Sequence, residues 1–354
     1  MNTHDILALL NGSDDLALFA DAALTHRRVF GDEVFIRAVV EFSNVCNKKC
    51  HYCGLRAPNA KLRRYRMSAP EILDTACAAA SDGAGTVVLQ SGDDTGYDTA
   101  LIGDLIRQIK ASHSVAVTLS LGDRGIDEYA FWRDCGADRC LIKVETSNPR
   151  LYKRLRQGED FSARLRRVEA MRQMGYEVGS GVIAGLPGAT LLDAARDILL
   201  LTDLGLEMIA VGPFVPNPDT PLAASPPGHV ALSHRMTALL RTLNPEANIP
   251  ATTALDALDP SSRALALARG CNVLMPSMTP ADHRGDYTIY PGKNADAIDD
   301  PLAEARRSIL ATGFIPSSSM GFSPRSNHVQ QGTTRCAAGH RPGRTAQRGQ
   351  IIAD

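Results

Sequence analysis

The sequence predicts an α/β fold in which eight parallel strands and their helices form a (β/α)8 TIM-type barrel. From about residue 34, short apolar, β-branched runs alternate with stretches of helical spacing. No glycine-rich dinucleotide fingerprint follows the first run, which disfavours the alternative, an open doubly wound sheet. In a barrel the chemistry gathers at the C-terminal ends of the strands, so those ends are where functional residues are expected.

The expected strands are the apolar runs, at Val34–Phe42, Thr86–Gln90, Val115–Leu121, Cys140–Glu145, Val178–Ala184, Met208–Phe214, Ile249–Leu255 and Asn272–Met275. The expected helices have apolar positions every three or four residues, at Pro70–Ser81, Thr99–Ala111, Asp127–Cys135, Ser162–Met174, Ala189–Leu204, Ala231–Leu243, Pro260–Arg269 and Pro301–Ala311. Ser68 followed by Glu71 predicts a capping box at the first of these helices. Glycines that end four of them are Gly83, Gly136, Gly175 and Gly205.

Three regions follow from these patterns. Residues 1–33 are expected to form an N-terminal helical cap, and residues 34–313 the barrel. Residues 314–354 are poor in large apolar side chains and rich in Ser, Gly, Arg and Gln, so we expect a disordered C-terminal tail.

Composition excludes several classes of function. The 354 residues include 38 basic and 39 acidic ones, and 38 − 39 = −1, which argues against an electrostatically driven nucleic-acid binder. No apolar run approaches the roughly 18 residues that span a membrane. The N-terminus places acidic residues where a secretory signal needs basic and apolar ones, so we expect a cytoplasmic protein. Its eight cysteines are then not expected to form disulfides.

Three of the cysteines, Cys46, Cys50 and Cys53, follow the first expected strand with C-x3-C-x2-C spacing. Three thiolates on one loop can bind three irons of a 4Fe–4S cluster and leave the fourth iron open to a small molecule. The alternative is a structural zinc site with His51 as fourth ligand, but no second cysteine pair lies nearby to close it.

With Tyr52 before its last cysteine, this motif resembles that of the radical S-adenosylmethionine (SAM) superfamily. In that family the open iron binds the amino and carboxylate groups of SAM, and an electron from the cluster cleaves the sulfonium to give a 5′-deoxyadenosyl radical. The resemblance implies one 4Fe–4S cluster and SAM as cofactors. It makes Cys46, Cys50 and Cys53 metal ligands and catalytic residues.

The resemblance also assigns residues to SAM. The segment Gln90–Asp93 resembles the GGE-type motif that receives the SAM amino group, and Arg164 matches the arginine that pairs with the SAM carboxylate. Glu145 resembles a catalytic acid near the ribose and sulfonium, although a strand-end carboxylate is also a common ion-pair partner. The full expected cofactor set is Tyr52, Gln90, Ser91, Gly92, Asp93, Glu145, Arg164, Gly185, Met208 and Tyr290.

Longer strings resemble one branch, the FeFe-hydrogenase maturase family HydE. They include VGPFVPNPDTPL, NIPATTAL and NVLMPSMTP, and the resemblance runs from about Val34 to Lys293. It implies action on a cysteine-bound iron carbonyl–cyanide species during assembly of the hydrogenase diiron subcluster. It also implies transient contact with other maturation proteins and with an electron donor.

An anionic substrate of this kind would be held by polar and cationic side chains inside the barrel. Buried cations need anionic partners, and the substrate would be one. The residues expected to bind it are Thr118, Arg139, Lys143, Thr252, Thr253, Met275 and Tyr287. Met208 and Met275 are expected to form cavity wall.

Two departures from the family pattern are visible. HydE proteins typically read Arg-His-Glu where this chain has Lys143-Val144-Glu145, and lysine loses the bidentate guanidinium. No cysteine follows Lys293 until Cys336, so we expect a single cluster.

The main alternative function is a methylornithine synthase-like radical SAM mutase acting on an amino acid. Biotin synthase is disfavoured because it needs a second cluster held by strand cysteines, and only Cys140 lies on an expected strand. A non-catalytic metal-binding scaffold would leave the polar strand ends unexplained.

We expect Cys50→Ser to abolish SAM cleavage while leaving the fold intact, because the cluster would lose one of its three ligands. The measurement is 5′-deoxyadenosine production by the reduced, reconstituted variant. Retained production would contradict the cluster assignment.

Overall fold

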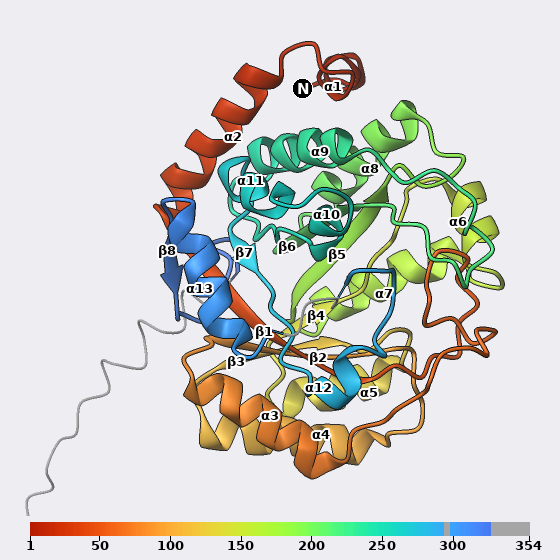
Figure 1. Ribbon diagram of the computed structural model, residues 1–354, viewed down its shortest axis with the longest axis vertical. Coiled ribbons are helices and arrows are strands. Elements are labelled where there is room, and N and C mark those ends of the chain that lie inside the picture. Colours follow the sequence, from red (N-terminus) through yellow and green to blue (C-terminus); the bar gives the residue numbers. More distant parts are fainter. Residues whose placement is uncertain (294–297, 327–354) are drawn as a thin grey trace, which may run out of the picture.

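The computed structural model describes residues 1–293 and 298–326 and shows an α/β fold with helices around a curved parallel sheet (Figure 1). The strands are β1 (Glu33–Ser43), β2 (Thr86–Ser91), β3 (Ala116–Ser120), β4 (Arg139–Leu141), β5 (Glu177–Ala184), β6 (Met208–Pro213), β7 (Val273–Leu274) and β8 (Ile315–Ser317). The longer helices are α1 (Thr3–Leu10), α2 (Asp15–Phe30), α3 (Ala69–Ser81), α4 (Thr99–Ser112), α5 (Ile126–Asp134), α7 (Phe161–Gln173), α8 (Leu191–Asp203), α9 (Val230–Leu243) and α13 (Pro301–Ala311). The shorter ones are α6 (Pro149–Leu155), α10 (Thr253–Leu258), α11 (Ser262–Ala268) and α12 (Ala281–Arg284).

The sheet runs in the order β6-β5-β4-β3-β2-β1-β7, with β8 also paired to β1, and every ladder between these strands is parallel. Because the strands are parallel, their C-terminal ends lie at one edge of the sheet, where the loops before the following helices meet. Strand interiors are buried on both faces, as expected of a sheet covered by helices. Among the described residues, no helix is long and apolar enough to cross a membrane.

Most expected elements are confirmed, including the capping box of Ser68 and Glu71 at the start of α3. The four expected helix-ending glycines all have positive φ, which a glycine adopts without the strain of a side chain. The expected helices of the N-terminal cap are α1 and α2, and α2 packs along α9 (Figure 1).

The expected seventh strand, Ile249–Leu255, is wrong. This segment makes isolated parallel bridges at Asn248 with Met208 and at Pro250 with Val273, and then turns into α10. Pro250 has no backbone N–H, so a continuous ladder loses a donor in the middle of the segment. The described strands therefore establish a curved parallel sheet between β6 and β7, with only bridges where the expected seventh strand would complete an eight-stranded barrel.

The boundary of the expected tail is also wrong for residues 314–326, while residues 327–354 lie outside the described residues. Residues 315–317 form β8, and residues 320–323 lie against the N-terminal ends of the strands. There Arg139 donates to the Met320 carbonyl (2.7 Å) and Asn248 to the Gly321 carbonyl (2.9 Å). Phe322 also lies against Arg139, whose guanidinium is 4.4 Å from the ring centroid. The composition of the segment hid this role because several of its contacts are made by backbone carbonyls.

We call the N-terminal ends of the strands, with residues 320–323 packed against them, the base of the sheet. Burying charged side chains there costs free energy, and one carboxylate provides the counter-charge. Arg139 is 1% exposed and forms an ion pair with the buried Glu177, which also accepts a hydrogen bond from the Ser323 backbone N–H (2.7 Å). The neighbouring Arg37 is buried as well, and its burial, together with the nearby Arg139, lowers the Arg37 pKa to about 9. Glu177 is therefore the counter-charge for two buried guanidiniums.

We expect Glu177→Ala to lower the free energy of unfolding by about 3–5 kcal/mol, because it leaves buried Arg139 unpaired. Urea denaturation under anaerobic conditions measures this change. Asp104→Ala is the matched control, since it removes the partner of exposed Arg107 and should cost at most about 1 kcal/mol. Equal losses in the two variants would contradict the account of the base.

Candidate active site

The three motif cysteines lie on the loop after β1 and line a cavity of about 770 Å³. Neighbouring backbone fixes this loop at three points. The Asn47 N–H donates to the Asp93 carbonyl (3.0 Å), the His51 N–H to the Leu155 carbonyl (2.8 Å) and the Gly54 N–H to the Ile289 carbonyl (2.8 Å). The end of β2, the end of α6 and the segment 287–293 therefore hold the cysteine loop.

The chemistry of this loop fits an iron–sulfur cluster. Burial raises the pKa of the thiols of Cys46, Cys50 and Cys53, so their thiolates need a positive partner, which bound iron supplies. Within the described parts of the chain, no three His, Cys, Asp or Glu side chains are grouped to hold one metal ion. Ligands to three different irons have no need to converge on one point.

Gly92 lets the end of β2 approach the cysteine loop closely. A Cβ at this position would lie 2.2 Å from the Val45 carbonyl oxygen and 2.8 Å from the Cys46 Cβ. Its N–H donates to the Ser43 carbonyl (3.0 Å), which joins the ends of β1 and β2. Any side chain here would push the cysteine loop away from the strand ends.

Four cations surround the carboxylate of Asp123, which follows β3. Its oxygens lie 2.7 Å from Arg167, 3.0 Å from Arg164, 3.3 Å from Lys48 and 3.4 Å from Arg156. Although burial raises the pKa of Asp123, these cations lower it to about 2, so the carboxylate is ionised at neutral pH. Lys48 also pairs with Glu159 (2.8 Å) and Asp93 (3.6 Å), and Arg156 lies 4.0 Å from Glu145, so these cations and carboxylates form one ion-pair network beside the cysteine loop.

Arg164 lines the cavity and is 5% exposed. Besides Asp123, its guanidinium donates from Nε to the Tyr152 hydroxyl (3.1 Å), which fixes its orientation. Arg156 lies between Asp123 and the Tyr52 hydroxyl, to which it donates at 3.2 Å. Two oriented guanidiniums beside the cysteine loop are suited to a carboxylate ligand.

Glu145 has a left-handed backbone, with φ of 65°, which is rare for a residue with a side chain. Its N–H donates to the Gly181 carbonyl (2.9 Å), and its carbonyl accepts from the Ile183 N–H (3.0 Å). The carboxylate lines the cavity 3.0 Å from the Lys143 ammonium. Although burial raises its pKa, Lys143 and Arg156 lower it, so Glu145 carries a negative charge.

The turn after Glu145 is held by α8. The buried Asp197 accepts hydrogen bonds from the Ser147 backbone N–H and the Thr146 hydroxyl (3.4 Å), and Asp193 accepts from the Asn148 side chain (2.9 Å). Burial raises the pKa of Asp197 to about 6. Asp197 thus does not reach the cavity but positions Glu145 through the following turn.

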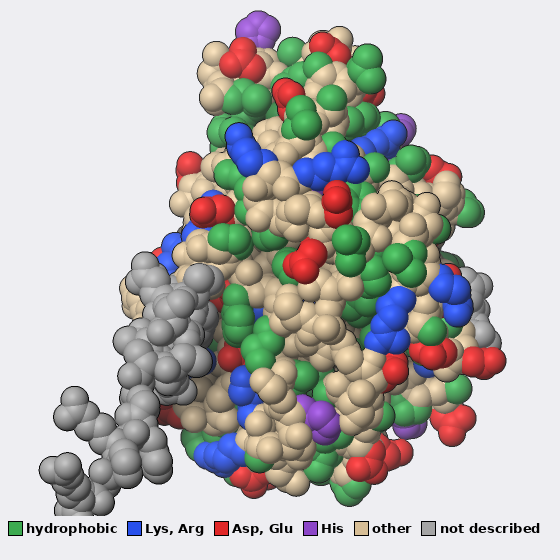
Figure 2. Space-filling model, turned by 90° about the vertical axis from the view of Figure 1, so that its left-hand side faces the viewer, with side chains coloured by type: hydrophobic (Ala, Val, Ile, Leu, Met, Phe, Trp, Pro, Cys, Tyr) green, Lys and Arg blue, Asp and Glu red, His purple; other side chains and the backbone are tan. Residues whose placement is uncertain are grey.

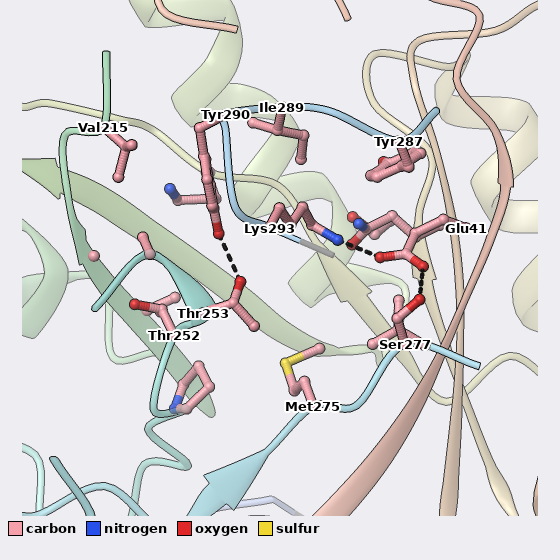
Figure 3. A pocket seen from close by; sticks show the side chains of 18 of the residues that line it. Glu41, Val215, Thr252, Thr253, Met275, Ser277, Tyr287, Ile289, Tyr290 and Lys293 are labelled. Atoms are coloured by element: carbon pink, nitrogen blue, oxygen red, sulfur yellow. Dashed lines mark hydrogen bonds and ion pairs between the residues drawn. The ribbon is translucent and has the colours of Figure 1, made fainter. Parts of the chain in front are cut away.

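A second charged group lies on another wall of the cavity (Figure 3). Glu41, 1% exposed, forms an ion pair with Lys293 and accepts hydrogen bonds from Ser277 and Thr279. Although burial raises the pKa of Glu41, Lys293 lowers it. The Tyr290 and Thr253 hydroxyls are hydrogen-bonded at 2.6 Å, so the segment that carries Lys293 is joined to α10 as well as to β1 (Figure 3).

The structure brings most of the expected site residues to this one cavity. Those that line it are Cys46, Cys50, Tyr52, Cys53, Gln90, Ser91, Gly92, Asp93, Lys143, Glu145, Arg164, Met208, Thr252, Thr253, Met275, Tyr287 and Tyr290. Whether each contacts SAM or the substrate stays a prediction.

Three expected site residues do not line this cavity. Arg139 begins β4 and therefore lies at the opposite end of the sheet, in the base described above. Thr118 is buried within β3 as the register partner of Arg139. Gly185 lines a separate hollow beside residues 226–230. The expected substrate contact of Arg139 is therefore not supported. Arg139 was expected at the C-terminal ends of the strands, but it lies at the N-terminal end of β4.

Sequence reasoning missed Asp123, Arg156, Lys48, Glu41 and Lys293. Asp123 directly follows the expected third strand, so strand-end position alone pointed to it. Lys48 stands between two motif cysteines. Arg156 lies after α6, a helix that was not expected, and Glu41 was hidden inside an apolar strand.

Comparison with known proteins defines the class first. Residues 40–201 match the radical SAM superfamily, so the chain is an enzyme of the kind that uses a 4Fe–4S cluster and SAM. It is 47% identical over 277 residues to the [FeFe] hydrogenase maturase subunit HydE of Thermotoga maritima, covering 78% of this chain and 79% of that protein. The chain belongs to the HydE family of radical SAM enzymes.

More distant relatives share the fold. The 3-methylornithine synthase of Methanosarcina barkeri is 25% identical over 310 residues, which are 86% of each chain. A crystal structure of methylornithine synthase superposes with a TM-score of 0.80 at 24% identity, over 89% of this chain and 94% of that one. The FeFe-hydrogenase maturase HydG from Carboxydothermus hydrogenoformans gives 0.74 at 21% identity, over 90% of this chain and 76% of that one.

We expect Asp197→Ala to raise the KM for SAM about tenfold, because losing its hydrogen bonds costs about 1–3 kcal/mol and releases the turn that positions Glu145. Asp197→Asn keeps an oxygen acceptor and should restore most of the affinity. The measurement is KM and kcat for SAM cleavage by the reconstituted variants. Equal KM values in the alanine variant and the parent would contradict a positioning role.

Asp197 also predicts a pH effect on stability. Its pKa is raised in the folded protein, so folding favours the protonated form, and this contribution is lost as pH rises from about 4 through about 6. Asp197→Asn should therefore gain stability relative to the parent more at pH 8 than at pH 5. Thermal unfolding of both proteins at the two pH values measures the difference, and a difference that does not change with pH would contradict the buried, ionised carboxylate.

Proposed function

We propose that this enzyme reductively cleaves SAM and acts in assembly of the diiron subcluster of FeFe-hydrogenase, on a cysteine-bound iron carbonyl–cyanide precursor. The observation that carries the proposal is the 47% identity to a HydE protein over more than three quarters of both chains. The cavity supports it, because the motif cysteines line the same cavity as Lys143, Thr252, Thr253, Met275 and Tyr287, five of the seven residues expected to bind the substrate.

We assign the cofactor end of the cavity to Cys46, Cys50 and Cys53 as cluster ligands. The cluster, when bound, supplies the reducing electron and an open iron for the SAM amino and carboxylate groups. Gly92 brings the Gln90–Asp93 turn next to this loop, where its polar groups receive the SAM amino group. Arg164, oriented by Tyr152 and Asp123, pairs with the SAM carboxylate.

Glu145 has a separate task in this scheme. Held in a left-handed turn beside Lys143, its carboxylate faces the cavity and accepts hydrogen bonds from the ribose or attracts the sulfonium. Its negative charge near the cationic sulfur orients SAM for cleavage.

The substrate end is assigned to residues away from the cysteines. Thr252 and Thr253 follow the bridge at Pro250, and Tyr287 comes from the segment between α12 and α13. The ammonium groups of Lys143 and Lys293, each paired with one carboxylate, offer N–H donors to an anionic complex, and Met208 and Met275 form apolar wall. Other maturation proteins and an electron donor are expected partners.

One observation keeps an amino-acid mutase as a second candidate. Lys143-Val144 replaces the Arg-His of typical HydE proteins. Lys143 lines the cavity, whereas Val144 is fully buried and does not. A single ammonium that pairs with Glu145 is a weaker anchor for a planar anion than a guanidinium.

The discriminating experiment adds candidate substrates to the reconstituted, dithionite-reduced enzyme and measures 5′-deoxyadenosine. We expect stimulation by a cysteine–iron carbonyl–cyanide complex and none by L-lysine. Lys143→Arg should preserve or increase the response to the iron complex, because it restores the family's guanidinium. Stimulation by L-lysine alone would contradict the maturase proposal and favour the mutase.

A further inference from the structure

The outer face of α6 carries positive charge that no neighbouring side chain neutralises. The helix contains Arg150, Lys153 and Arg154 and no acidic residue, and spacings of three and four place these three side chains on one exposed face. The Arg154 guanidinium donates to the Pro187 carbonyl (2.9 Å). Within the described ranges 1–293 and 298–326, none of the three has a carboxylate within 4.0 Å.

Several cations elsewhere on the surface are paired with carboxylates. Farther along the chain from the cysteine loop, Lys61 pairs with Asp219, and Arg63 with Asp286. On the face that carries α2 and α13, acidic and basic side chains are interspersed (Figure 2). In a chain with a formal net charge of −1, α6 carries three exposed cations and no acidic residue among its seven residues. The exposed Lys49, on the cysteine loop itself, adds to it.

The opposite face of α6 packs on the cysteine loop. Leu151 and Leu155 form one buried apolar cluster with Cys50 and Tyr52, and the Leu155 carbonyl accepts from the His51 N–H (2.8 Å). A single helix, about 10 Å across, thus separates the basic face from a cluster ligand. α6 itself lies at the edge of the molecule, with its outer side uncovered by other elements (Figure 1).

The acidic residues nearest in sequence are already engaged. Glu159 pairs with Lys48 (2.8 Å), and Asp160 caps α7 through the Ser162 and Ala163 N–H groups. Neither carboxylate is therefore available to screen Arg150 or Lys153.

We propose that the basic face of α6, formed by Arg150, Lys153 and Arg154 with Lys49, is the docking surface for an acidic one-electron carrier protein. Opposite charges speed and orient such encounters, and the surface lies over Cys50. In the complex the reduced carrier loses one electron, the cluster held by the three cysteines gains it, and no atom is transferred. The proposal rests on the cluster chemistry of the proposed function but not on the identity of the substrate.

The test compares the double variant Arg150→Glu/Lys153→Glu with the parent holoenzyme, using a reduced flavodoxin as the acidic carrier. At low ionic strength we expect at least about a tenfold loss in the rate constant for cluster reduction, followed by absorbance in the absence of substrate. Binding of oxidised flavodoxin, measured by calorimetry, should weaken by a similar factor, and raising the salt should shrink both differences. SAM cleavage driven by dithionite should be unchanged, because dithionite does not need the surface.

Arg28→Glu is the control variant. Arg28 is exposed on α2, on a different side of the molecule, and its reversal tests whether net charge alone explains an effect. Lys153→Gln, which removes a charge without adding one, should give an intermediate loss. The single variant Lys153→Glu changes the net charge by the same amount as Arg28→Glu and is measured beside it. Unchanged flavodoxin kinetics, an equal loss in Arg28→Glu and Lys153→Glu, or loss of dithionite-driven cleavage would each overturn the proposal. Failure of the iron complex to stimulate cleavage would overturn the maturase assignment and leave this test unaffected.

Discussion

The carboxylate of Asp123 is the contact on which the organisation of the cofactor end depends. It joins the end of β3 to Lys48 of the cysteine loop, to Arg156 after α6 and to Arg164 of α7. Without it, several buried cations would repel one another beside a loop that has to stay in place. Asp93, Glu145 and Glu159 pair with some of the same cations, and Arg164 still lines the cavity near the cysteines, where its guanidinium suits an anionic group on SAM.

The cavity has two ends with different chemistry. Near the cysteines, guanidiniums and backbone groups are arranged around a fixed loop, and Glu145 is held in a left-handed turn. At the other wall, Glu41, Lys293 and the hydroxyls of Thr253 and Tyr290 connect the segment after α12 to β1 and α10. Membership of the radical SAM superfamily fits the first end, where the motif cysteines lie. We propose that the second end, together with the Lys143-Val144 replacement, binds the substrate.

The periodicity of the sequence predicted nearly every long element, and most of the site residues expected from strand-end position and from the family resemblance line the cavity. It failed where tertiary contacts decide. Pro250 interrupts an apolar run that has the pattern of a strand. Residues 320–323 are held by backbone hydrogen bonds and by the contact of Phe322 with Arg139, which composition does not reveal. Arg139 was assigned to the wrong end of its strand because the sequence does not show at which end of a strand a buried cation lies. Asp123 and Arg156 could not be recognised as a pair before α6 and α7 were placed beside β3.

The central claim is that Cys46, Cys50 and Cys53 hold a 4Fe–4S cluster whose fourth iron is open to SAM. Its most direct test is electron paramagnetic resonance of the reconstituted, reduced protein, recorded before and after SAM is added, with iron content measured on the same sample. The account predicts about four irons per chain and a reduced-cluster signal that changes when SAM binds the open iron. A signal unaffected by saturating SAM, or zinc in place of iron, would contradict it.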